Sequence, residues 1–259
     1  MADPLAPESL FSLAGRTALV TGGSLGIGAM VASGFAAGGA RVLVVARGVD
    51  PGPDAIAADL GSAEGCAAAV AAVGERTDHL DVVVHSAGAT ALTPVDRADD
   101  DEWDRILDLN LRAVQRLTAG LLPLLTARAT ADDPSRSIVI GTTSGLVTSG
   151  MPDAAYGASK AAVHHLVRYQ ARELAARHVL VNAIAPGLFS TRMSSFLEHE
   201  SIRGPVLSTI PLGRPGRAQE IAGAAVFLAS RAGGYVTGEV LVVDGGRTGA
   251  GRADPIAGL

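Results

Sequence analysis

The chain has 259 residues, enough to bury the core of one large domain or two small ones. Hydrophobic residues make up 48% of the sequence and charged residues 18%, which is typical of a globular α/β protein. The formal charge of −5, with acidic and arginine residues interspersed, excludes the basic surface of a nucleic-acid-binding protein. A single cysteine, Cys66, excludes an internal disulfide and a cysteine metal cluster.

The amino-terminal segment carries Asp3, Glu8 and two prolines but no apolar core, so we expect no signal peptide. No apolar run is long enough to cross a bilayer. The lone cysteine suits a reducing compartment. These features predict a cytoplasmic protein with neither a membrane nor a nucleic-acid partner.

A glycine-rich turn follows the first predicted strand, which covers residues 16–21. The turn reads Thr21-Gly22-x-x-x-Gly26-x-Gly28, and a helical pattern then runs to Gly38. Glycines let the backbone approach a pyrophosphate, and the helix N-terminus faces the negative charge of that group. The segment therefore predicts a dinucleotide-binding turn.

The second predicted strand, residues 41–46, ends beside Arg47. A carboxylate at such a position would bind both ribose hydroxyls, whereas an arginine favours a 2′-phosphate. We therefore expect NADP in preference to NAD, the alternative being that Arg47 is merely solvated.

Residues 48–53 leave no room for a full crossover helix before the third strand at 55–60. At its end, Asp59 can reach the adenine amino group or cap its own turn.

A helix is predicted over residues 62–76 and a strand over 80–85, followed by a small-residue turn that lets a cofactor pass. The pattern over 99–125 predicts one long helix that ends near Pro123. Asn110 interrupts its apolar stripe. Because a buried amide must be hydrogen-bonded, Asn110 either bridges structural elements or holds a water for proton transfer.

A strand over residues 137–140 leads into a hydroxyl-rich turn, residues 141–145. Tyr156 and Lys160 follow on a helix that runs to about His178, and their spacing of four places them on one face. A phenol acting near pH 7 needs its pKa of about 10 lowered by about 3 units, or about 4 kcal/mol. One ammonium at about 4 Å supplies that order of energy, and Lys160 is the only lysine in the chain.

The remaining elements are a sixth strand over 179–184, a helix over 218–229 and a strand over 239–243. Residues 188–210 are amphipathic and predict a substrate lid, and residues 247–259 predict a loose tail. The three histidines of the region 164–178 lack metal-ligand geometry, so no metal site is expected. We predict one domain over 1–259, with a doubly wound parallel sheet of about seven strands and helices on both faces.

Several motifs together resemble the short-chain dehydrogenase/reductase family over residues 11–246, in particular 3-oxoacyl-(acyl carrier protein) reductases of the rhamnolipid-biosynthesis type. The residues that carry the resemblance are the turn Thr21 to Gly28, Asn110, Tyr156-x-x-x-Lys160, Asn182-Ala-Ile-Ala-Pro186-Gly187 and Asp244-Gly-Gly246. The resemblance implies that Tyr156 is the proton donor, that Lys160 lowers its pKa and holds the nicotinamide ribose, and that Asn110 retains a relay water. It also implies a homotetramer packed through the helices at 99–125 and 156–177.

The chain departs from the family pattern at the serine that polarises the substrate carbonyl. Ungapped alignment places that function at Thr142, whose methyl group crowds the site and stiffens the side chain. Ser144 has an unhindered hydroxyl, and on that ground we favour it slightly. The usual Asn-Asn pair is replaced by His85-Ser86, and Leu25 stands where phosphate-preferring relatives carry a basic residue.

The resemblance implies two sets of binding residues. The predicted cofactor contacts are Gly22, Ser24, Leu25, Gly26, Ile27, Gly28, Arg47, Asp59, Leu60, Ser86, Ala87, Gly88, Tyr156, Lys160, Pro186, Gly187 and Thr191. The predicted substrate pocket consists of Ala89, Thr90, Leu92, Gly150, Met151, Leu188, Met193 and Phe196.

These residues predict an NADP-dependent reductase of a hydrophobic ketone, such as a 3-oxoacyl thioester or a polyketide-like carbonyl. One alternative is an NAD-dependent alcohol dehydrogenase that works in the oxidative direction. Another is a non-catalytic cofactor-binding protein on the same fold, which the altered serine position and His85-Ser86 motivate.

Overall fold

The computed structural model describes residues 3–191, 194 and 199–250. Seven parallel strands form one sheet in the order β3-β2-β1-β4-β5-β6-β7. They are β1 (Thr17–Thr21), β2 (Arg41–Ala46), β3 (Ala55–Ala57), β4 (Val82–His85), β5 (Ser135–Ile140), β6 (Val179–Pro186) and β7 (Val240–Val243). The strand order changes direction between β1 and β4, and a crevice at such a point is where open parallel sheets bind ligands. The predicted fold class is confirmed.

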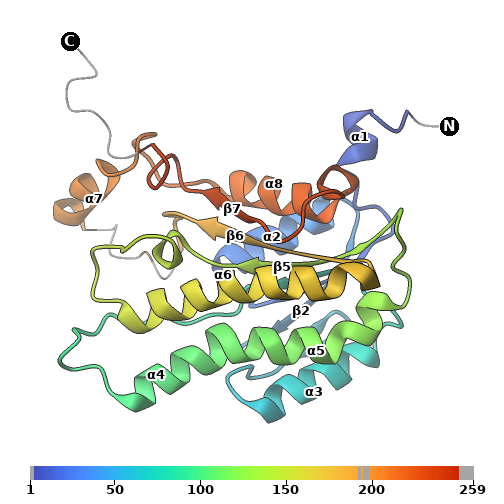
Figure 1. The fold of residues 1–259 in the computed structure, drawn as a ribbon, viewed down its shortest axis with the longest axis horizontal. Helices are drawn as coiled ribbons and strands as arrows, with labels where there is room; N and C mark the ends of the chain where they lie inside the picture. The colour runs from blue at the N-terminus through green and yellow to red at the C-terminus, as the bar shows by residue number, and fades with distance from the viewer. Residues whose placement is uncertain (1–2, 192–193, 195–198, 251–259) are drawn as a thin grey trace.

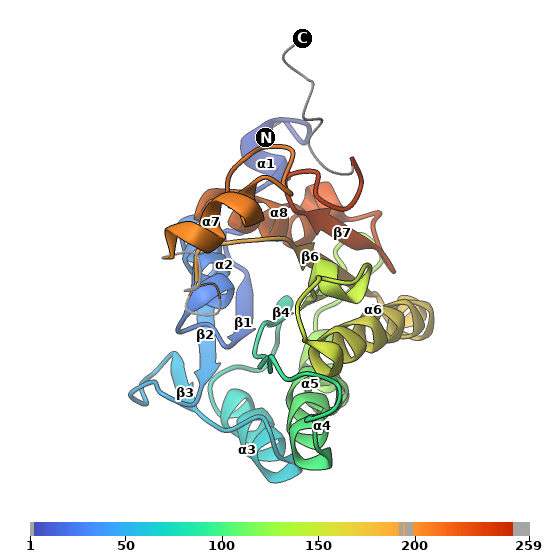
Figure 2. The same ribbon diagram turned by 90° about the vertical axis from the view of Figure 1, so that its left-hand side faces the viewer.

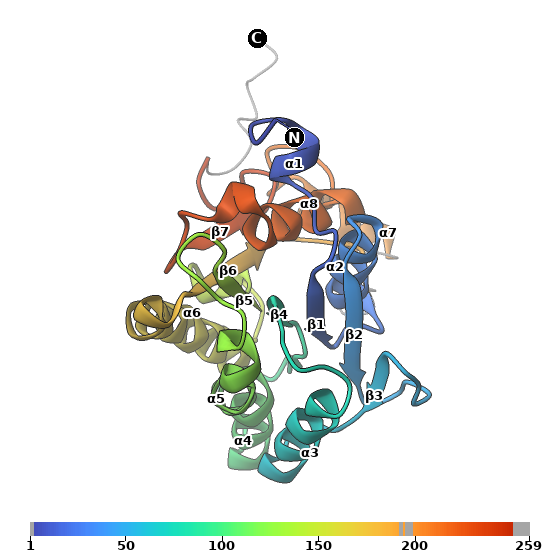
Figure 3. The same cartoon turned by 90° about the vertical axis from the view of Figure 1, so that its right-hand side faces the viewer.

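Helices cover both faces of the sheet (Figure 1). Helices α2 (Gly26–Ala37) and α8 (Ala218–Ala229) lie on one face. Helices α3 (Ala63–Gly74), α4 (Asp100–Leu107), α5 (Ala113–Thr126) and α6 (Ala154–Leu174) lie on the other (Figure 3). Two short helices, α1 (Pro7–Leu10) and α7 (Glu200–Leu207), lie outside these layers. The doubly covered sheet explains why its central strands are almost continuously apolar.

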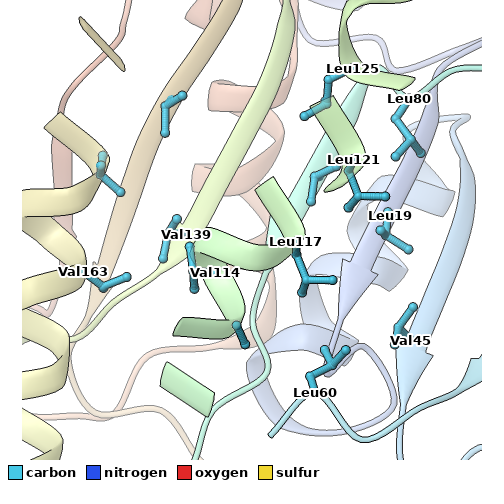
Figure 4. Close-up of a cluster of buried hydrophobic side chains, with 14 of the residues drawn as sticks. Leu19, Val45, Leu60, Leu80, Val114, Leu117, Leu121, Leu125, Val139 and Val163 are labelled. Carbon is cyan, nitrogen blue, oxygen red and sulfur yellow. The ribbon is translucent and has the colours of Figure 1, made fainter. Parts of the chain in front are cut away.

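Each face of the sheet has its own hydrophobic cluster. Under α3, α5 and α6, leucines and valines of the helices and strands form one cluster, in which Leu117, Leu121 and Leu125 of α5 join Leu19 and Leu80 (Figure 4). Under α2 and α8, Phe35 is fully buried. The two cores fix the sheet rigidly, so loops at the carboxyl ends of its strands are held in place.

The predicted long helix over 99–125 is interrupted. A π-helical segment, Asp108–Arg112, joins α4 to α5 and places Asn110 at its centre. The predicted end, at residue 125 near Pro123, agrees with the observed end at Thr126 to within one residue, and Pro123 itself lies inside α5. A proline near a helix end removes only one of the last backbone bonds, so α5 tolerates it.

The predicted lid and tail are described only in part. Of the lid, α7 is observed, whereas residues 192–193 and 195–198 lie outside the described residues. Of the tail, residues 251–259 lie outside them too. Within the described part of the chain, no helix is both long and apolar enough to cross a membrane.

Candidate active site

The turns after β1 and β4 meet at the crevice where the strand order changes. The Thr21 hydroxyl accepts hydrogen bonds from the backbone N–H groups of Ser86 and Ala87, at 3.1 and 3.2 Å. A side chain on Gly22 would come within 2.9 Å of the Ala87 backbone, and a side chain on Gly28 would overlap the Gly22 carbonyl. Both glycines are therefore required for the two turns to pack against each other.

The N-terminus of α2 has unused hydrogen-bond donors at this crevice. Leu25 occupies the N-cap position and makes no side-chain capping bond, and Gly26 adopts a left-handed backbone conformation with φ of 56°. Thr191, after β6, lies 3.6 Å from the position that a Gly26 side chain would occupy. Free N–H groups at a helix N-terminus suit the pyrophosphate of a dinucleotide, so the observed cradle fits NADP. When bound, that cofactor supplies a hydride from its nicotinamide ring.

Asn110 is completely buried and its amide group is fully used. Its Oδ1 accepts a hydrogen bond from the Ala89 backbone N–H, and its Nδ2 donates to the Ala89 carbonyl, both at 2.9 Å. The second Nδ2 proton goes to Oγ of Ser159 at 3.0 Å. Of the two roles predicted for this side chain, the structure supports the structural bridge, which joins the loop after β4 to helix α6.

Tyr156 and Lys160 lie on one face of α6, as predicted. The Lys160 ammonium is buried, donates a 2.8 Å hydrogen bond to the Ile140 carbonyl and lies 5.9 Å from the centre of the Tyr156 ring. Gly88 packs against Asn110 and the Lys160 ammonium: a side chain on Gly88 would lie 3.2 Å from Oδ1 of Asn110 and 3.6 Å from Nζ of Lys160. The loop after β4, the π-helical segment and α6 therefore meet around the ammonium.

The protonation equilibria differ from the sequence prediction. Burial raises the pKa of the Tyr156 phenol; side-chain hydrogen bonding with Thr142 opposes this rise and the charge of Asp153 adds to it. Burial also lowers the pKa of Lys160, to about 8. The predicted lowering of the phenol pKa by Lys160 is not seen in this arrangement: burial sets the direction of the shift, and the ammonium bonds to the Ile140 carbonyl.

The two candidate hydroxyls, Thr142 and Ser144, lie on the turn that follows β5. Thr142 interacts with the phenol of Tyr156, and its Oγ1 accepts a 3.3 Å hydrogen bond from the backbone N–H of Ser144. Ser144 turns its carbonyl oxygen toward α6, within 3.3 Å of the place of a Gly157 side chain. Thr142 therefore lies beside the phenol, and which of the two hydroxyls polarises the carbonyl stays a prediction.

The other predicted residues lie at the carboxyl edge of the sheet, which faces the viewer in Figure 2. Arg47 follows β2 and is exposed, whereas Asp59 accepts a 3.1 Å hydrogen bond from the Gly61 N–H and so caps its own turn. Leu60 is buried in the core. Among the predicted pocket residues, Ala89, Thr90, Leu92, Gly150, Met151 and Leu188 belong to loops that follow β4, β5 and β6. Met193 and Phe196 lie outside the described residues.

Sequence reasoning missed Ser159, which is fully buried. Its hydroxyl accepts from Asn110 and donates to the Tyr156 carbonyl at 2.7 Å, so it connects the π-helical segment to the turn that carries the phenol. Its place immediately before Lys160, on the buried side of a helix, was the available signal. No group of histidine, cysteine and carboxylate side chains in the described ranges could hold a metal ion.

The fold and the glycine turn define a Rossmann-like α/β protein, and comparison with known proteins identifies its family. The family model described as enoyl-(acyl carrier protein) reductase matches residues 22–248. The rhamnolipids biosynthesis 3-oxoacyl-[acyl-carrier-protein] reductase of Pseudomonas aeruginosa is 41% identical, over 91% of this chain and 97% of the relative. The 3-oxoacyl-[acyl-carrier-protein] reductase FabG of Escherichia coli is 37% identical, over 90% and 97%.

A solved structure, the Pseudomonas aeruginosa RhlG/NADP active-site complex, matches with a TM-score of 0.89 and 41% identity, covering 92% of this chain and 98% of that chain. The chain belongs to the short-chain dehydrogenase/reductase family. The predicted resemblance is confirmed.

Proposed function

We propose that this protein is an NADP(H)-dependent ketoreductase that converts a hydrophobic ketone into a secondary alcohol. The observation that carries the proposal is geometric: the Tyr156 phenol interacts with Thr142, and the buried Lys160 ammonium lies on the same face of α6, 5.9 Å from the ring centre. The relatives that are named 3-oxoacyl-[acyl-carrier-protein] reductases, and the relative solved with NADP, support the same reaction and cofactor.

In the proposed mechanism, Thr142 orients the carbonyl oxygen of the substrate with its hydroxyl, and Tyr156 donates a proton to that oxygen as the alcohol forms. Burial disfavours the phenolate, so Tyr156 begins the reaction in the form that reduction requires. Lys160 remains mostly protonated below pH 8 and holds the Ile140 carbonyl, next to the turn that carries Thr142. Proton return from solvent to Tyr156 belongs to the same proposal, with Asn110 fixing the surrounding backbone.

The side chains around the entrance favour an apolar substrate. Leu92, Leu146, Val147 and Met151 are all at least 41% exposed, and all belong to loops after β4 and β5. Exposed apolar side chains gathered on one edge bind apolar groups. A 3-oxoacyl thioester or polyketide-like ketone therefore suits the site better than a sugar.

We include in the proposal a cytoplasmic homotetramer that contacts neither nucleic acid nor membrane. The arginine of the β2 end, Arg47, supports the phosphorylated cofactor in preference to NAD. Light scattering on the purified protein, whose chain mass is 26.1 kDa, checks the tetramer.

The test is NADPH oxidation with acetoacetyl thioesters, longer 3-oxoacyl thioesters and a ketose, for the wild type and Tyr156→Phe. We expect thioester reduction by the wild type and a loss of at least about a hundredfold in the variant, the range that a general acid contributes. Equal rates for the two proteins would remove Tyr156 from the mechanism. A preference for the ketose would overturn the assignment of an apolar substrate.

A further inference from the structure

His164 is a buried imidazole that the mechanism does not use. It follows Lys160 by one turn of α6 and is 2% exposed. Neither ring nitrogen makes a well-formed hydrogen bond among the described residues, although the Gly145 backbone lies close enough to oppose the lowering of the ring's pKa. A buried polar group without a partner costs free energy, so its presence calls for an explanation. Its neighbour His165 is exposed and provides a natural comparison.

The imidazole packs against both ends of the turn that carries Thr142. A side chain on Gly141 would overlap Nε2 of His164, and a side chain on Gly145 would lie 2.9 Å from Cε1 of the same ring. The flat ring therefore occupies the space that side chains would fill at both glycines.

The adjacent turn of α6 holds the same segment from the strand side. Lys160 donates its 2.8 Å hydrogen bond to the carbonyl of Ile140, the residue immediately before Gly141. The turn also rests on the helix backbone, since a side chain on Gly145 would lie 2.8 Å from the carbonyl carbon of Lys160. Two successive turns of one helix thus fix the segment 140–145, and Thr142 lies between the fixed points.

We propose that His164 is a positioning residue that sets the place of the Thr142 hydroxyl relative to the Tyr156 phenol by filling the space beneath Gly141 and Gly145. The inference rests on the proposed ketoreductase function. It assigns to His164 no proton transfer and no contact with substrate. Burial together with the charges of Lys160 and Arg168 lowers the pKa of His164 to about 4, so the ring stays neutral while the enzyme works.

The test is a double-mutant cycle between His164→Ala and Thr142→Val, with steady-state NADPH oxidation on a 3-oxoacyl thioester. We expect His164→Ala to lower kcat about tenfold to a hundredfold, with a smaller effect on the KM for NADPH, because misplacing a reacting group by about 1 Å costs that much. In the Thr142→Val background, the same substitution should change kcat less than about twofold, since the group that it positions is already absent.

His165→Ala is the matched control and should leave kcat unchanged. His164→Gln, with a flat amide that reaches to the same depth, should restore much of the rate. Should His164→Ala fail to fold, His164→Asn replaces it in the cycle, with circular dichroism to verify the fold.

Independent, multiplicative effects of the two substitutions, or a wild-type kcat for His164→Ala, would overturn the inference. If the inference about His164 fails in this way while Tyr156→Phe still abolishes turnover, the proposed ketoreductase function is unaffected. Activity in Tyr156→Phe would instead remove the function on which the inference rests.

Discussion

The two asparagines of the chain allow the site to be separated from the fold by a matched pair of substitutions. Asn110 and Asn182 are both buried and both hydrogen-bonded. Asn182 donates to the Val236 carbonyl at 2.8 Å and accepts from the Glu239 N–H at 3.0 Å, so it ties β6 to the segment before β7. Asn110 bonds instead to Ala89 and Ser159, next to Tyr156 and Lys160.

We predict that Asn110→Ala destabilises the protein by about 3 kcal/mol, because it removes three hydrogen bonds worth about 1 kcal/mol each. Asn182→Ala removes two and should cost about 2 kcal/mol. Per folded molecule, Asn110→Ala should also lose about tenfold or more in kcat, because Ser159 and Ala89 are released around the phenol. Asn182→Ala should retain its kcat.

Urea denaturation followed by circular dichroism gives the two free energies of unfolding, and NADPH oxidation below the onset of unfolding gives kcat. Asn110→Asp adds a check: it can still accept from the Ala89 N–H but donates neither of the other two bonds. Wild-type stability in Asn110→Ala would refute the hydrogen-bond reasoning. An equal loss of kcat in both alanine variants would show that Asn110 acts only through general stability.

Two further predictions concern pH and cofactor choice. Burial lowers the pKa of both His85 and His164 from 6.5 to about 4. As the pH falls, each imidazole is therefore protonated at a higher pH in the unfolded chain than in the folded protein. The free energy of unfolding should therefore fall as the pH drops from 6.5 to 4, by up to about 3 kcal/mol per ring. Urea titrations across this range should show a shallower slope for His164→Gln and an unchanged slope for His165→Ala; no pH dependence would contradict the assignment. Arg47→Asp should weaken NADPH binding by about tenfold, because an attraction between the arginine and the 2′-phosphate is replaced by repulsion. NADH lacks that phosphate, so its binding should be unchanged or tighter. Tighter NADPH binding by that variant in a fluorescence titration would contradict the role of Arg47.

The sequence predicted the strands and helices well because their apolar periodicity is local. The last helix, residues 218–229, coincides with its prediction, and α3 begins immediately after Ser62, which caps it by accepting from the Gly65 N–H. Such signals depend on neighbours a few residues away. The π-helical segment was not predicted, because a shift from α to π bonding leaves the apolar stripe readable as one helix.

In the site, the positions of Tyr156, Lys160 and Asn110 were predicted, but their contacts were not. The target of the Lys160 ammonium is a carbonyl on β5, and only the packing of α6 against the sheet determines it. The direction of the phenol pKa shift is set by burial, which spacing along a helix cannot give. Ser159 and His164 looked like ordinary helical residues because their partners lie on distant segments.

The π-helical turn at Asp108–Arg112 holds one residue more than a regular turn would. The extra residue is accommodated within this turn, so deleting one residue here would restore α-helical bonding and redirect the Asn110 side chain while α4 and α5 keep nearly the same relative orientation. A shortened chain could regain regular helical bonding and still misdirect the amide that supports the phenol. Alignments and redesigns of this helix should therefore treat its length as part of the catalytic geometry.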